Sequence, residues 1–170
     1  EPLARAAGSD LDLARLHHLR GGFFFVQGRS ADCLREHEAA LAHARAAGSV
    51  EAEANALSGL GDAGYVAGRM RTANERFRVC VELAQRHGLG RIEVANKHML
   101  GWTFHYLGRF DEALAVGEDA VNMARQVSAQ RTEAVARQTV AYTQGWLMGR
   151  LSPALEHLDR ALPVVQALGA

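Results

Sequence analysis

The chain has 170 residues, of which 48% are hydrophobic and 22% are charged, which is ordinary for a globular protein. Its 19 basic and 19 acidic residues cancel, so no global field draws it to nucleic acid or to an anionic membrane. No apolar run reaches the ~20 residues of a membrane span, and two cysteines are too few for a disulfide framework. These features predict a protein of a reducing compartment, the cytoplasm, whose partner is neither nucleic acid nor membrane.

An internal repeat organises the whole sequence. The dipeptide Gly-Arg recurs at intervals of 40, 40 and 41 residues, and a second turn marker follows each pair 20 residues later. This spacing predicts a unit of two halves, repeated four times. The Gly-Arg pairs begin at Gly28, Gly68, Gly108 and Gly149, and the second markers are Gly48, Gly88, Ser128 and Gly169.

Each half of the repeat reads as a helix. Ala, Leu, Arg, Glu and Gln dominate, while Val, Ile and Thr never cluster in the alternation of a strand. A Gly after each half can take the left-handed conformation that ends a helix. Pro163 lies inside the last half and should bend it, since its ring clashes with the carbonyl of Asp159. The expected helices are 11–27, 30–47, 51–67, 70–87, 91–107, 110–127, 131–148 and 151–168.

The repeat divides the chain into one continuous array. Residues 3–9 parallel residues 43–49, so 1–9 should be the tail of a preceding repeat, and the chain, which starts with Glu1, should be a piece of a longer protein. Repeats cover their apolar faces only with neighbouring repeats, so open ends should favour self-association. The expected repeats are 10–50, 51–90, 91–130 and 131–170.

The third repeat resembles the tetratricopeptide family. Leu100-Gly101, Phe104, Gly108, Phe110, Ala113 and Ala120 fall where that family's signature has Leu-Gly, an aromatic residue, a turn glycine, a second aromatic residue and two small residues. The second repeat keeps Leu60-Gly61, and in the fourth Ala141-Tyr142 replaces that pair. The 40-residue unit is longer than the family's 34 and is similar to the repeats of large bacterial regulators, namely ATP-binding transcription activators and multidomain nucleotide cyclases. The resemblance implies an all-α, right-handed α-solenoid of about four antiparallel helix pairs.

Motifs of catalysis and cofactor binding have a simpler explanation in this chain. Gly59–Gly64 matches the dinucleotide fingerprint, but it lies within an expected helix instead of after a strand. The eight histidines lack the spacing of a helical metal site. Cys33 and Cys80 occupy small-residue positions of second helices, which favours buried hydrophobic roles. The sequence thus nominates no catalytic, cofactor or metal residue, and the chain is not expected to be an enzyme.

The first helix of each repeat carries the candidate binding residues. In the tetratricopeptide family these helices line a concave groove, and the side facing away from the core combines rings, imidazoles and polar groups. We expect this groove to bind a protein or peptide, although some rings could instead pack between repeats. The groove residues are His18, Phe25, Asn55, Asp62, Tyr65, His98, Trp102, His105, Tyr106, Thr143 and Trp146.

The leading hypothesis is a protein- or peptide-binding scaffold module of a larger bacterial signalling protein. The alternative is a domain that senses a small ligand or signal peptide and controls an attached output domain, and an enzyme is the remote third. If the imidazoles face the partner, affinity should change between about pH 5.5 and 7.5, where unperturbed histidine titrates.

Overall fold

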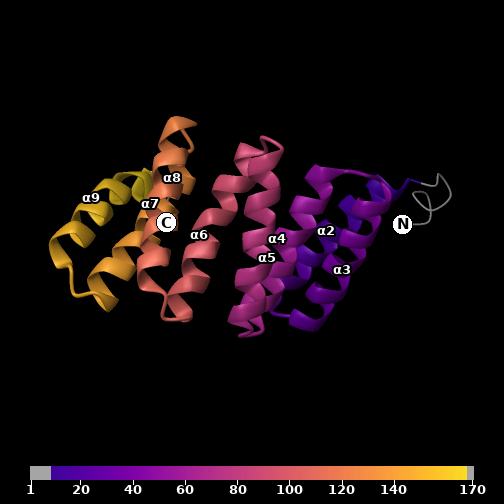
Figure 1. Cartoon of the computed structure of the whole chain (residues 1–170), viewed down its shortest axis with the longest axis horizontal. Coiled ribbons are helices and arrows are strands. Elements are labelled where there is room, and N and C mark those ends of the chain that lie inside the picture. Colours follow the sequence, from indigo (N-terminus) through magenta and orange to yellow (C-terminus); the bar gives the residue numbers. More distant parts are fainter. Residues whose placement is uncertain (1–8, 168–170) are drawn as a thin grey trace. The chain divides into compact units, whose positions relative to one another are not determined.

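The computed structural model describes residues 9–167, and every regular element in that range is helical (Figure 1). The predicted all-α helical-repeat fold is confirmed, and seven of the predicted helices match observed ones to within one residue at each end. The elements are α2 (Asp10–Val26), α3 (Ser30–Ala46), α4 (Val50–Val66), α5 (Met70–Arg86), α6 (Gly90–Tyr106), α7 (Phe110–Gln126), α8 (Gln130–Tyr142), the π-helix η1 (Thr143–Leu147) and α9 (Leu151–Ala167).

The chain forms two compact units, the first ending at Glu93 and the second beginning at Val94. In the first unit, α2, α3, α4 and α5 pack in sequence, and α2 also contacts α4. Small residues dominate the contacts, which lets the helix backbones approach closely. The largest fully buried side chain is Phe77 of α5, and Leu57 of α4 packs beside Cys80.

Glycines in α4 explain the apparent dinucleotide motif. A Cβ on Gly59 would lie 2.1 Å from the ring of His37, and one on Gly61 would lie 2.5 Å from the ring of Phe77. A Cβ on Gly64 would lie 3.2 Å from the backbone of Ala73. The three glycines therefore give α3 and α5 room to pack against α4, as expected from their place within a helix.

The Gly-Arg dipeptide has a structural role in the first repeat. Gly28 has a φ of +70°, and the backbone nitrogen of Arg29 donates to the carbonyl of Phe24, which closes the turn. The Arg29 guanidinium lies 4.4 Å from the centre of the Phe24 ring and donates to Asp32 in the first turn of α3. Arg109 repeats this arrangement between Phe104 and Glu112. The arginine thus joins the first helix to the second.

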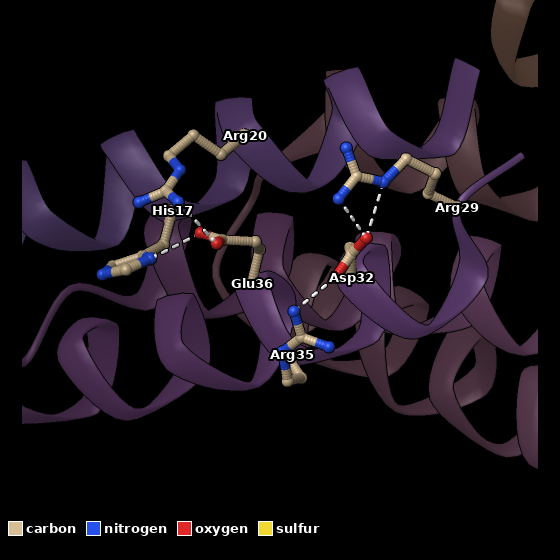
Figure 2. Close-up of polar contacts among 6 residues, drawn as sticks. All are labelled: His17, Arg20, Arg29, Asp32, Arg35 and Glu36. Carbon is tan, nitrogen blue, oxygen red and sulfur yellow. Dashed lines mark hydrogen bonds and ion pairs between the residues drawn. The ribbon is translucent and has the colours of Figure 1, made fainter. Parts of the chain in front are cut away.

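Polar contacts join α2 to α3 beside that turn (Figure 2). Glu36 of α3 lies 2.7 Å from Nδ1 of His17 and 3.0 Å from Nη2 of Arg20, both on α2. Asp32 pairs with Arg35 as well as with Arg29, and the Arg29 guanidinium holds the pKa of Asp32 below its ordinary value. Each acid of this network therefore has a basic partner.

The second unit contains most of α6, then α7, α8, η1 and α9. Its core includes Ala120 and Val121 of α7 packed against Ala136 and Val140 of α8. A Cβ on Gly117 would lie 2.7 Å from Cγ2 of Val140, so this glycine also allows close helix contact.

A π-helical turn accommodates the extra residue of the fourth repeat. The backbone nitrogen of Arg109 bonds to the carbonyl five residues earlier, whereas that of Arg150 bonds to Gln144, six residues earlier. The inserted residue is therefore absorbed in η1, after α8. The predicted single helix 131–148 is corrected to an α-helix followed by this π-turn.

The last helix runs through Pro163 without a break to Ala167. Pro163 has no amide hydrogen to donate to the Asp159 carbonyl, so a bend there stays a prediction. None of the described helices is long and apolar enough to cross a membrane. The predicted repeat tail at 1–9 lies, apart from Ser9, outside the described residues.

One face of α9 is strongly apolar and exposed. The positions 41 residues earlier, on α7, include Leu114, Gly117 and Val121, which pack against α8. The face of α9 therefore corresponds to one that receives the first helix of a following repeat. Its exposed fractions are 66% for Leu151, 58% for Leu155, 44% for Leu158, 52% for Leu162 and 37% for Val165.

We expect this face to support the predicted self-association. Leu158→Glu should lower the weight-average mass in sedimentation at high concentration, because it places a charge at the centre of the apolar face. Arg160→Glu, an exposed residue of the same helix, is the matched control and should assemble as the wild type does. A wild type that stays monomeric at every concentration would rule the prediction out.

Candidate binding surface

Six rings of the second unit form one continuous cluster, which we call the ring surface. His105 of α6 is its centre, and its ring centroid lies 4.9 Å from that of Tyr142 and 5.1 Å from that of Trp102. Tyr142 in turn stacks on Trp146 at 6.1 Å. The ring surface comprises Trp102, His105, Tyr106, Phe110, Tyr142 and Trp146.

The ring surface is part packing and part open. His105 is 7% exposed, whereas Tyr106 is 54%, Tyr142 40% and Trp146 78% exposed. Trp102 is half-buried between Tyr142 and the rings of its own helix. A set of rings held together at its base and open at its rim suits binding, because little side-chain entropy remains to be lost.

Imidazoles here are held in their neutral form. Burial lowers the pKa of His105, and it lowers the pKa of His98 to about 4. Nδ1 of each ring is buried without a hydrogen-bond partner among the described residues. The expected change in affinity between pH 5.5 and 7.5 therefore moves to lower pH, because these rings stay neutral where free histidine titrates.

Thr143 does not lie on the predicted groove face. It is fully buried, and its hydroxyl donates to the carbonyl of Thr139 at 3.0 Å. Because the extra residue is absorbed in η1, the 40-residue interval holds through residue 142, so Tyr142 is equivalent to Trp102 and Val140-Ala141 to Leu100-Gly101. Counting the interval from the start of α8, rather than back from Gly149, would have identified Tyr142.

The other predicted groove residues belong to the first unit. Asn55, Asp62 and Tyr65 of α4 are half-buried, as is Phe25 of α2. His18 is half-buried and packs against His37 with ring centroids 5.2 Å apart. Burial lowers the pKa of His18 and raises that of Asp62 to about 6. Their role in binding stays a prediction.

Neither cysteine has the environment of a nucleophile. Cys33 and Cys80 are 1% and 0% exposed, which confirms the buried reading. Burial raises the pKa of both thiols, that of Cys80 to about 12, and the Cys80 thiol donates to the carbonyl of Ala54. Among residues 9–167, no three His, Cys, Asp or Glu side chains are arranged to hold a metal ion.

A second surface, on the first unit, lies between the two second helices α3 and α5. It is a hollow of about 450 Å³ with α4 as its floor, and we call it the α3–α5 hollow. Its apolar lining includes Leu34, Leu41 and Leu60. Its charged lining is Glu38, Arg45, Arg69 and Arg76.

Comparison with known proteins identifies the fold. No family model matches the sequence, and no curated protein matches it. Among solved structures, the apo form of RapI is similar with a TM-score of 0.85 and 11% identity, over 94% of this chain and 58% of RapI. BtubC (BKLC) from P. vanneervenii gives 0.77 and 17%, over 96% and 72% of the two chains, and MamA gives 0.69 and 15%, over 99% and 85%.

These similarities concern architecture. The three proteins have tetratricopeptide-like helical repeats, which supports the resemblance noted in the third repeat. The chain spans little more than half the length of RapI. At identities of 17% or less the likeness shows the shared fold, and the chain has a tetratricopeptide-like helical-repeat fold.

Proposed function

We propose that this chain is a protein- or peptide-binding module of a larger bacterial regulatory protein of the cytoplasm, and that the ring surface holds the partner. The observation that carries the proposal is the exposed rim of Tyr106, Tyr142 and Trp146 around a nearly buried imidazole. Aromatic residues are enriched at binding hot spots, and the similar folds support the use of a helical-repeat face as a binding surface.

An apolar or aromatic peptide side chain suits the ring surface best. The rings offer apolar area and edge-to-face contacts, while the tyrosine hydroxyls and the Trp146 indole nitrogen can form hydrogen bonds. Sensing of a small ligand or signal peptide is the alternative, and it would use the same rings with a smaller occupant.

Peptide selection followed by titration tests the proposal. Peptides selected from a random display library on the wild-type chain should bind Trp146→Ala and Trp102→Ala at least tenfold more weakly, since truncating an aromatic anchor costs ~2 kcal/mol or more. Trp146→Ala should leave thermal stability unchanged, because 78% of that residue is exposed. Phe23→Ala, which removes an exposed ring of the first unit, is the matched control.

Two results would count against the ring surface. One is a selection that yields only peptides bound equally well by the wild type and both tryptophan variants. The other is competition by metabolites alone, which would favour the small-ligand alternative. In the first case the α3–α5 hollow becomes the better candidate.

A further inference from the structure

The polar network of the first repeat has lost its acids in the second. Residues 40 positions after those drawn in Figure 2 place Thr72 where Asp32 stands and Arg76 where Glu36 stands. Leu57 and Leu60 replace His17 and Arg20. The second repeat therefore keeps the arginine of the Gly-Arg pair, Arg69, and lacks the groups that hold its equivalents.

Arg69 differs from Arg29 and Arg109 in both of their contacts. The ring beneath the guanidinium, Phe24 or Phe104, is replaced by Gly64, and the first-turn acid is replaced by Thr72. Within residues 9–167, the side chains of Arg69 and Arg76 have no hydrogen bond or ion pair. Both are exposed, and both line the α3–α5 hollow.

The composition of the hollow defines what fits there. Arg45 is held at one rim by a 2.8 Å hydrogen bond to Glu53, and Glu38 is the single acid in the lining against three arginines. The floor is apolar, formed by Leu60, Ala63 and Gly64 of α4. A cation-rimmed hollow of about 450 Å³ with an apolar floor matches a segment that carries acidic groups around a large apolar side chain.

We propose that the α3–α5 hollow is a second docking site, for an acidic peptide segment of a protein partner. Carboxylates of the segment pair with Arg69 and Arg76, and an apolar side chain between them packs on Leu60. Guanidinium groups bind carboxylates through paired N–H donors, so the two arginines select acids and orient the segment. The site is separate from the ring surface and does not depend on it.

Restoring the missing acid provides a specific test. Thr72→Glu supplies the first-turn acid that holds Arg109 in the third repeat, so it should pair with Arg69 and occupy it. Thr72→Gln has nearly the same size and no charge, and it leaves Arg69 available. The probes are synthetic peptides with two Glu residues flanking Leu, Phe or Trp at varied short spacings, each with a counterpart that has Gln in place of Glu.

We expect the best peptide to bind the wild type and Thr72→Gln alike, and Thr72→Glu at least tenfold more weakly. Added salt should weaken binding, and Arg69→Ala with Arg76→Ala should also weaken it at least tenfold. Arg78→Ala, whose guanidinium pairs with Glu82 on the same helix, should have no effect. Trp146→Ala should leave this binding unchanged, which separates it from the ring surface.

Two outcomes would overturn the proposal. In one, no Glu peptide binds more tightly than its Gln counterpart. In the other, Thr72→Glu and Thr72→Gln bind the best peptide with equal affinity. Circular dichroism of each variant confirms folding, and if Thr72→Glu does not fold, the double arginine variant decides by the same tenfold criterion.

Discussion

Gly59→Ala should destabilise the protein by about 3 kcal/mol, although alanine is the better helix former. The new Cβ would lie 2.1 Å from Cε1 of His37. That ring cannot move aside, because a Cβ on Gly21 would lie 2.5 Å from its Nε2 on the α2 side. His37 is 2% exposed and fills the space between two glycines on two helices, so one added methyl group forces the helices apart.

A double-mutant cycle isolates this contact. In a His37→Ala background the obstacle is gone, so Gly59→Ala should cost little or even stabilise, by up to ~1 kcal/mol from helix propensity. Gly22→Ala is the control on α2, since nothing lies within 4 Å of its added Cβ. The measurement is the free energy of unfolding in urea. A Gly59→Ala variant as stable as the wild type would show that α3 and α4 do not pack this closely.

Asp62→Asn should stabilise the protein near pH 7.5 by about 2–3 kcal/mol and have little effect near pH 4. Burial raises the pKa of Asp62 from 3.8 to about 6, so folding favours the protonated carboxyl. The charged form is disfavoured in the folded state, and this penalty grows as pH rises from about 4 to 6 and is complete above it. Asparagine removes the charge and with it the penalty.

Comparing the variant with the wild type at each pH separates this effect from the histidines. Burial lowers the pKa of His37 and His98 to about 4, so stability from their neutral forms is lost as pH falls below 6.5 in both proteins. Glu75→Gln, an exposed acid of α5, is the control. Thermal unfolding from about pH 4 to 8 gives the difference. A stability difference between Asp62→Asn and wild type that does not change with pH would contradict the raised pKa.

Local patterns were sufficient to locate the helices. Turn glycines recur at fixed intervals, and Gly28, Gly48, Gly68, Gly88, Gly108 and Gly149 all have positive φ, as does Ser128 at 53°. A residue that ends a helix acts within a few residues of itself, so its position can be read without knowledge of the fold. The ends of the helices and the all-α class were predictable for this reason.

The face on which each side chain of the fourth repeat lies was decided by tertiary packing. One extra residue could have been placed anywhere between Gln130 and Gly149, and only the packing of Val140 against Gly117 fixes α8 in register and leaves the insertion to η1. A shift of one residue turns a helix face by 100°, which exchanges buried Thr143 for exposed Tyr142.

The sequence by itself determined the repeat, its helices and their turns, because these depend on interactions between near neighbours along the chain. The tertiary structure decided which rings meet in the ring surface and which arginines of the Gly-Arg pairs have partners. Arg29 and Arg69 stand in the same dipeptide, yet only the first lies over an aromatic ring and beside an acid. Those contacts join residues of successive helices, and the distances between them are set by how the helices pack.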